Sequence, residues 1–532
     1  MLTPLFHRNL FLLFSALVAF SLPLSEVGVS VGMIGLVVNW IIESRFRLFP
    51  KFSRVELPLL LFLVIYALGI VGLIFTSDFS WAFHDLRIKL PLLLLPIVFF
   101  FSERLSEKEF RLILLALVLG VFIGSVASML ALFGVIPVEI SSSRSISLFI
   151  SHIRFSLLVC MAICGLIYLL IKDFSLLSIS MRVGGIALAG WLFVFIFILQ
   201  SITGMVILSV LTLVFLVWKI LSIPNSMYRL WCFSFLGAAL LIGASFVTGT
   251  IASYYKVEIV DPNIENYTTA NGRLYTNDFT STDSENGHYV DLLVCEEELA
   301  REWNQRGKVR YDELSTNGFH VKYALKRYLT SKGIPKDSVG VWSLSEKEVA
   351  AVSKGVANVL ELSPFNIKGK IYRLVREMNV YMQDGNVGGS SLAQRFVYWK
   401  LAKEIFFENW LIGVGTGDIK LAYKQKYAEN PSLLAPQFQL RAHNQYITMF
   451  TTYGLFGGFL FIAALIVPII LLRSWKEPLI LAFSIIILLS MLNEDTFENH
   501  IGVSFAAFFY SVLIFSWKRT VPEIKSLKLD AS

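Results

Sequence analysis

Long apolar runs recur along this chain and leave it few ways to fold. Hydrophobic residues make up 55% of the 532 residues and charged residues only 16%, whereas a soluble domain is about one quarter charged. A helix that crosses a bilayer needs roughly 20 mostly apolar residues, and many of the runs approach that length. The sequence therefore predicts an all-α polytopic membrane protein and excludes an ordinary soluble protein.

The apolar runs divide the chain into candidate membrane spans. We predict about twelve transmembrane helices, of which the second, seventh and eleventh are short. They lie near residues 8–24, 27–42, 56–75, 85–101, 111–133, 153–171, 184–200, 202–220, 231–252, 445–472, 478–493 and 501–517. About nine spans therefore precede a long polar segment, and about three follow it.

Basic residues gather in alternate loops between these runs. Cytoplasmic loops carry the excess Lys and Arg in membrane proteins. The residues are Arg45, Arg47, Lys51, Arg54, Arg104, Lys108, Arg111, Lys172, Arg182, Lys219, Arg229, Arg473, Lys476, Lys518 and Arg519. Because their alternation is unbroken, we predict cytoplasmic termini and an external polar segment at 253–442. These loops also account for the net charge of +7, so no nucleic-acid partner is predicted.

The predicted topology gives four regions. They are an N-terminal membrane region at 1–252, an external domain at 253–442, a C-terminal membrane region at 443–517 and a cytoplasmic tail at 518–532. The external domain is expected to be large and mainly helical. Apolar periodicity predicts helices there at 296–305, 321–331, 368–382 and 391–407. Ser345 and Glu348 have the spacing of a capping box.

The predicted helix at 391–407 carries two cations within its apolar stripe. Arg395 and Lys403 share that stripe with aromatic and aliphatic side chains. Their long stems could cover apolar surface while the charges reach its rim. Alternatively, they could face an anionic ligand beneath the external domain. Arg395 is the better candidate because a guanidinium matches phosphate oxygens bidentately.

The stretch Arg441-Ala442-His443-Asn444 closes the polar segment just before an apolar run. A neutral imidazole can accept a proton from an attacking hydroxyl near neutral pH, or orient that hydroxyl. A lone histidine is more often structural, but its place beside Arg441 favours a functional site. Asn444 could cap the following helix or hold the imidazole, and both interpretations stay open.

Three further segments could contribute to such a site. The glycines of the stretch 413–418, including Gly415 and Gly417, allow a backbone to approach a ligand closely, although a structural loop is the more probable role. Arg154, at an outer helix end, could anchor its helix or bind a lipid phosphate, and we favour the phosphate slightly. The loop 493–500 holds three carboxylates, which could serve acid–base chemistry or bind a divalent cation. We favour a third interpretation, a solvated loop that pairs with arginines.

The cysteine and histidine spacing predicts neither a metal centre nor a cofactor. No Cys/His cluster has the spacing of a zinc site. The external segment contains Cys295 and no second cysteine with which it could form a disulfide.

Taken together, four elements resemble the O-antigen ligase/polymerase superfamily. They are Gln394-Arg395 through Trp399, the glycine stretch at 413–417, His443-Asn444 before a span, and Gly454-Leu455-Phe456-Gly457 within that span. The resemblance is close over 390–460 and elsewhere rests on topology. It implies a GT-C-like fold in the bacterial inner membrane, with a periplasmic active site.

The resemblance also implies a reaction. It would be an inverting glycosyl transfer that needs neither a metal ion nor a cofactor. The donor would be a glycan on undecaprenyl pyrophosphate, and the acceptor a sugar such as one of lipid A–core. His443 would be the base or orienter for the acceptor hydroxyl. Arg395, with Arg441 and Arg154, would bind pyrophosphate and offset the charge on the leaving group. Asn444, Lys403, Gly415 and Gly417 are further candidates for binding the substrate.

The chain departs from this family in two places. Many relatives have an arginine near the outer end of a middle span, where this chain reads Gln200-Ser201-Ile202-Thr203-Gly204. The segment 262–385 resembles an insertion, for which we predict acceptor recognition or a structural role in the external domain.

Other functions remain open at this stage. An O-antigen ligase is our main interpretation, and an O-antigen polymerase or a protein O-oligosaccharyltransferase is the alternative within the family. A flippase or transporter for lipid-linked glycans belongs to a different class. Transporters tend to carry charged residues near mid-membrane, whereas the polar residues here gather at the outer boundary, which favours an enzyme.

Overall fold

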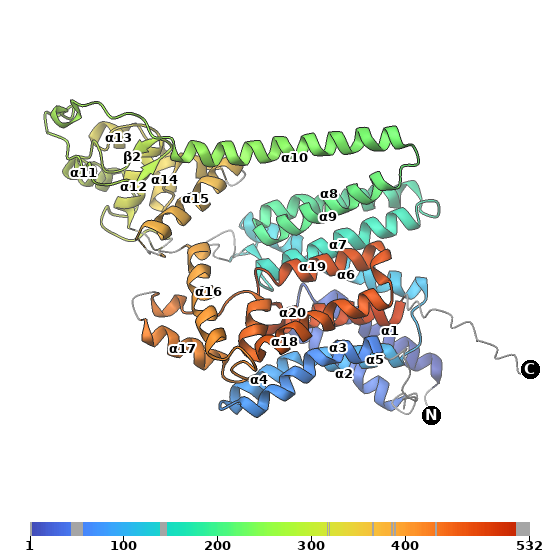
Figure 1. Ribbon diagram of the computed structural model, residues 1–532. Helices are drawn as coiled ribbons and strands as arrows, with labels where there is room; N and C mark the ends of the chain where they lie inside the picture. Colours follow the sequence, from blue (N-terminus) through green and yellow to red (C-terminus); the bar gives the residue numbers. More distant parts are fainter. Residues whose placement is uncertain are drawn as a thin grey trace, which may run out of the picture. The chain divides into compact units, whose positions relative to one another are not determined.

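The computed structural model describes residues 3–43, 57–138, 146–316, 318, 320–363, 366–384, 387, 390–430 and 434–517. These residues are predominantly α-helical, and they form one two-stranded antiparallel hairpin from β1 (Ser284–Glu285) and β2 (His288–Tyr289) (Figure 1). The helices are α1 (Pro4–Ser21), α2 (Glu26–Ile42), α3 (Leu57–Val71), α4 (Phe79–Lys89), α5 (Pro91–Phe101), α6 (Glu107–Leu132), α7 (His152–Lys172), α8 (Ile179–Leu199), α9 (Ile202–Leu221), α10 (Ser226–Tyr255), α11 (Glu296–Arg306), α12 (Val321–Ser331), α13 (Ser338–Trp342), α14 (Glu346–Ser353), α15 (Ile367–Asp384), α16 (Ser391–Glu408), α17 (Ile419–Glu429), α18 (Gln445–Leu471), α19 (Pro478–Ser490) and α20 (His500–Tyr510).

Within the described residues, nine of the twelve predicted spans form helices long and apolar enough to cross a membrane. The helices α2 and α19 are apolar but shorter. The run at 85–101 is divided between α4 and α5, because Pro91 cannot continue a helix but is favoured in its first turn. The fold class agrees with an all-α polytopic membrane protein, and the total of twelve spans stays a prediction.

The predicted helices of the polar segment form as α11, α12, α15 and α16. The capping box is also present, since Ser345 accepts from the amide of Glu348 and the Glu348 carboxylate accepts from the amide of Ser345. Some of the predicted basic loops lie outside the described residues, namely those with Arg45, Arg47, Lys51, Arg54, Lys518 and Arg519.

The chain forms two compact units. The first unit comprises Met1–Leu216 and Gln394–Ser532, and the second comprises Val217–Ala393. This division concerns compactness rather than the membrane, so the predicted regions 1–252, 253–442, 443–517 and 518–532 stay a prediction.

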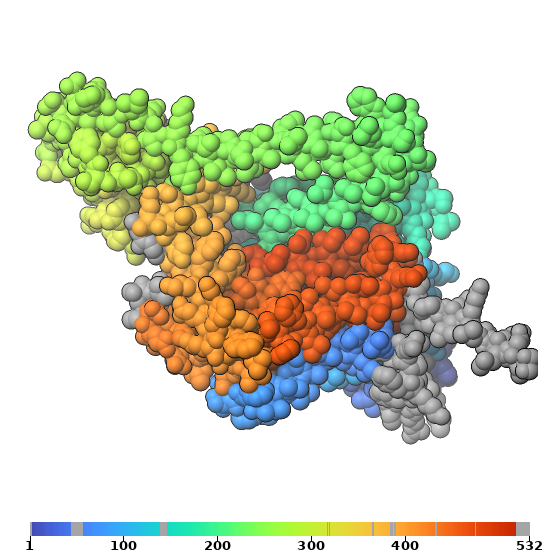
Figure 2. Space-filling model, in the orientation of Figure 1, coloured from blue at the N-terminus to red at the C-terminus, as the bar shows by residue number. Residues whose placement is uncertain are grey.

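The first unit joins the two ends of the sequence. The helix α3 packs against α18, and α5 packs against α20, so that red C-terminal helices lie against blue N-terminal ones (Figure 2). Phe62 of α3 stacks on Tyr510 with 3.9 Å between ring centroids, and Phe110 of α6 stacks on Trp517 at 4.0 Å. Inside a bilayer such contacts stabilise by close packing rather than by removing apolar surface from water.

The second unit has its own apolar core. Trp303 of α11, Tyr328 of α12 and Val352 of α14 are fully buried in it. At the hairpin, the buried Glu285 pairs with Arg327 at 2.6 Å and with Arg376 at 3.0 Å. Because these arginines come from α12 and α15, one carboxylate links both helices to the hairpin.

A break in α18 brings the two glycine motifs of the sequence into contact. Gly454 interrupts the helix with φ 69° and ψ −169°, a conformation essentially confined to glycine. A Cβ on Gly454 would lie 2.3 Å from the carbonyl oxygen of Leu411, and one on Gly413 would lie 2.3 Å from that of Thr452. Both positions therefore require glycine so that the two backbones can touch.

The loop after α16 satisfies backbone groups that the break leaves without helical partners. The amide of Val414 donates to the carbonyl of Thr451 at 3.1 Å, and that of Gly415 donates to the carbonyl of Thr452 at 2.9 Å. The amide of Gly417 donates to the Thr76 hydroxyl at 3.1 Å. The loop thus fixes the first half of α18, which begins one residue after Asn444, against the connection between α3 and α4.

We predict that Gly454→Ala destabilises the protein by about 2 kcal/mol or more, because the added Cβ meets backbone at a positive φ. Thermal unfolding of the detergent-purified protein measures this effect. Gly243→Ala in α10 is the matched control, since a Cβ there meets nothing within 4 Å. Equal melting temperatures for the two variants would contradict the proposed packing role of Gly454.

Candidate functional site

His443 occupies a tight turn immediately before α18. Its φ of 47° lies in the left-handed region, which costs a residue with a side chain about 1–3 kcal/mol. The turn is held from α16, because the Trp399 indole N–H donates to the carbonyl of the buried Ala442 at 3.0 Å. The ring of Tyr398, also on α16, lies 5.8 Å from the His443 ring between centroids. The helix α16 therefore packs beside the His443 turn.

Asn444 acts as the N-cap of α18. Its side-chain oxygen accepts from the amide of Ile447 at 3.1 Å, and its nitrogen donates to the carbonyl of Leu492 at 2.9 Å. Of the two roles that the sequence left open, these contacts favour capping over a hydrogen bond to the imidazole. The second contact also ties the turn to the loop between α19 and α20, hereafter the acidic loop (491–499).

Further hydrogen bonds fix the acidic loop on the start of α18. The amide of Gln445 donates to the carbonyl of Met491 at 2.9 Å, and the Gln445 side chain accepts from the amide of Phe497 at 2.7 Å. The Thr448 hydroxyl donates to the carboxylate of Asp495 at 2.7 Å. The loop and the His443 turn consequently form one rigid assembly.

Glu494 is the point at which the predicted site residues meet. Its carboxylate interacts electrostatically with His443, Arg154 and Arg395. Burial and the neighbouring Asp495 raise the pKa of Glu494, and the guanidinium groups of Arg154 and Arg395 oppose that rise. The Arg395 guanidinium also donates to the carbonyl of Asn493, with a long separation of 3.4 Å. The contact of Arg395 with Asn493 and that of Asn444 with Leu492 thus place α16 and the His443 turn beside the same loop.

Arg441 pairs with Glu498, the third acidic residue of the loop. Its Nη1 donates to Oε2 of Glu498 at 3.0 Å, and the Glu498 side chain is only 6% exposed. Burial disfavours the charged forms of Arg441 and Glu498. The carboxylates of Glu498 and Asp495 outweigh this effect at Arg441 and raise its pKa. Likewise Lys89 and Arg441 hold the pKa of Glu498 well below its usual range. The acidic loop does hold a partner arginine as predicted, but Asp495 is buried and the side chain of Glu498 is nearly so, rather than solvated.

Sequence reasoning missed the charged residues of α4. Lys89 lies 2.8 Å from Asp85 and 2.8 Å from Glu498, and all three side chains are only 6% exposed. The sequence did contain a sign of these residues, an Asp and a Lys four residues apart at the start of an apolar run. Ionisable residues are rare in such segments and are usually functional. The predicted span at 85–101 therefore carries a buried ion pair that the sequence analysis did not single out.

Three predicted binding residues lie elsewhere. Lys403 is exposed on α16, just over two turns beyond Arg395. Gly415 and Gly417 pack against backbone, and their amides donate to Thr452 and Thr76 as described above. Their contacts are those of the structural loop that the sequence favoured for this stretch.

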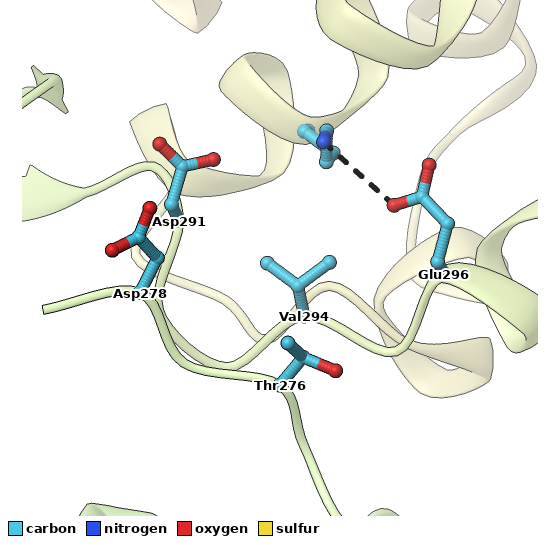
Figure 3. Close-up of a pocket in the computed structure, with 6 residues that line it drawn as sticks. Thr276, Asp278, Asp291, Val294 and Glu296 are labelled. Carbon is cyan, nitrogen blue, oxygen red and sulfur yellow. Dashed lines mark ion pairs between the residues drawn. The ribbon is translucent and has the colours of Figure 1, made fainter. Parts of the chain in front are cut away.

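A pocket of about 190 Å³ lies in the second unit (Figure 3). Its acidic side chains have partners of their own. Glu296 pairs with Lys326 at 3.7 Å, Asp278 accepts from the Thr280 hydroxyl at 2.6 Å, and Asp291 accepts from the Ser281 hydroxyl at 2.5 Å. These carboxylates stabilise their own loops, so we do not include the pocket in the candidate site.

No metal-binding group is found in the described part of the chain, where no three His, Cys, Asp or Glu side chains are arranged to hold an ion. The candidate site is therefore a cationic cluster of His443, Arg395, Arg154 and Arg441 around the buried carboxylates of the acidic loop. Such a cluster can bind an anionic group and accept a proton.

Part of the chain is similar to a known protein family. A family model described as O-antigen ligase matches residues 349–462. The matched stretch begins in α14, contains α16 and the glycine loop, and ends in α18 after the Gly454 break. It includes all four elements on which the sequence resemblance rests. No curated protein matches the chain.

Proposed function

Because this match assigns the chain to the O-antigen ligase/polymerase superfamily, we propose that it is a glycosyltransferase that uses a glycan on undecaprenyl pyrophosphate. The family and the apolar helices indicate a multi-pass bacterial membrane protein. The single observation that carries the finer proposal is that Arg395 and the His443 turn both contact the acidic loop, through the carbonyls of Asn493 and Leu492. That cluster pairs a proton acceptor with guanidinium groups suited to phosphate.

In the proposed reaction, a hydroxyl of the acceptor sugar attacks the anomeric carbon of the donor. The new C–O bond forms as the bond between that carbon and the phosphate oxygen breaks, with inversion of configuration. The bonding electrons leave with undecaprenyl pyrophosphate. His443 takes the proton of the attacking hydroxyl, and Glu494 stabilises the imidazolium that results. Arg395, Arg441 and Arg154 offset the charge that builds on the leaving group.

The proposed site faces the periplasm from the inner membrane, with both termini in the cytoplasm. The alternation of basic loops supports this orientation. Nucleotide sugars are cytoplasmic donors and could not reach such a site, whereas a lipid-linked donor could. We propose that a sugar of lipid A–core is the acceptor, which makes the protein an O-antigen ligase, and that the segment 262–385 contributes to acceptor recognition.

We predict that His443→Ala and Arg395→Ala each lower glycan transfer by about 10²-fold or more, because one removes the proton acceptor and the other removes charge stabilisation. Transfer is measured in membranes supplied with lipid-linked donor and acceptor, with protein amounts matched by immunoblot. The matched control is Arg182→Ala on α8, which lies outside the candidate site and outside the segment 262–385 and should retain transfer. Wild-type rates in the two site variants would overturn the assigned roles.

Deletion of the gene distinguishes the possible acceptors. For a ligase, we predict that long glycan polymer accumulates on the lipid carrier while mature lipopolysaccharide loses it, as analysed by gel and mass spectrometry of extracted lipids. Accumulation of single repeat units on the carrier would instead identify a polymerase. Loss of glycan from proteins, with lipopolysaccharide intact, would identify a protein O-oligosaccharyltransferase.

We also predict that transfer does not depend on a metal ion, because guanidinium groups rather than a ligand cluster face the proposed pyrophosphate site. Activity should persist when purified protein is treated with EDTA. Loss of activity with EDTA and its recovery with one divalent ion would contradict this prediction, and would assign metal binding to Glu494, Asp495 and Glu498.

A further inference from the structure

A chain of buried charges extends from the candidate site into α4. The Lys89 ammonium lies 2.8 Å from Oδ2 of Asp85 and 2.8 Å from Oε1 of Glu498. The other carboxylate oxygen of Glu498, Oε2, lies 3.0 Å from Nη1 of Arg441. Glu498 therefore bridges two cations, with a different oxygen facing each one.

Because the two oxygens of the Glu498 carboxylate face different cations, they limit the number of hydrogen bonds that Arg441 can donate to it. A carboxylate readily accepts two parallel hydrogen bonds from one guanidinium. Here Oε1 is engaged by Lys89, with a longer contact of 3.4 Å from the Gln445 side chain. Arg441 is thus limited to a single bond through Nη1. A guanidinium has five N–H donors, so this arrangement directs the others away from Glu498.

We propose that Lys89 is a positioning residue for the pyrophosphate of the donor, and that it acts through Glu498 on Arg441. By occupying Oε1, Lys89 prevents Glu498 from capturing Arg441 bidentately and leaves guanidinium donors for phosphate oxygens. Without Lys89, Arg441 would be the remaining cation paired with Glu498 among the residues that the structure describes, and Glu498 would compete with the substrate for it. The inference rests on the proposed function, in which Arg441 binds pyrophosphate.

Binding of inorganic pyrophosphate tests this role without requiring turnover. Affinity is measured by calorimetry on the purified full-length protein in detergent. We expect Lys89→Met to weaken binding about tenfold, in the range of coupling between residues of one charge network. Lys89→Arg restores a cation beside Oε1 and should recover most of the affinity. Lys172→Met, which removes the exposed pair with Glu107, is the matched control and should bind as the wild type does.

A double-mutant cycle separates positioning from general damage. If Lys89 acts through Arg441, Lys89→Met should have no further effect on affinity once Arg441→Gln is present. In transfer assays, Lys89→Met should raise KM for the donor and leave KM for the acceptor unchanged. If Lys89→Met does not fold, Asp85→Asn/Lys89→Met removes a cation and an anion together. That pair should show the same loss of pyrophosphate affinity.

Three results would overturn the inference: wild-type pyrophosphate affinity in Lys89→Met, losses that multiply in the Arg441→Gln background, or a wild-type protein that does not bind pyrophosphate. Failure of the proposed function is a separate result. A wild-type protein that binds pyrophosphate but transfers no glycan contradicts the function, and the affinities of the variants still decide the role of Lys89.

Discussion

The buried carboxylate of Glu498 is the contact on which the candidate site depends. It pairs with Lys89 from α4 and with Arg441 from the turn before α18, and all three side chains are largely buried. Removing one partner from such a network is costly because a charge is left buried without compensation. The ion pairs therefore hold the acidic loop, α4 and the His443 turn in one arrangement. That arrangement also presents Glu494 to His443, Arg154 and Arg395.

Backbone contacts support the same turn from the other side. The break at Gly454 leaves carbonyls of α18 without helical partners, and amides of the glycine loop satisfy them. The glycines at 413 and 454 allow this because a Cβ at either position would meet the opposite backbone. Two motifs that look separate in the sequence are therefore the two sides of one contact. Together they fix the position of the first half of α18, and with it the position of His443.

Much of the helical architecture could be predicted from the sequence, because length and apolar composition largely decide which segments form long helices. That Arg395 and His443 act in one site stays a prediction from their places in motifs. The ion pair between Lys89 and Glu498 was not predictable, since contact between α4 and the acidic loop depends on tertiary packing that local patterns do not encode. The roles of Gly415 and Gly417 were ambiguous for the same reason. Glycine permits close approach to a ligand or to another backbone, and only the fold distinguishes them.

The central claim is that the cationic cluster around the acidic loop holds the pyrophosphate of a lipid-linked donor. An electron cryo-microscopy structure of the protein in lipid nanodiscs, with such a donor bound, tests it most directly. We predict density for the two phosphates against the guanidinium groups of Arg395 and Arg441, with the anomeric carbon facing His443. Phosphate density at the opposite membrane face, or distant from both arginines, would contradict it.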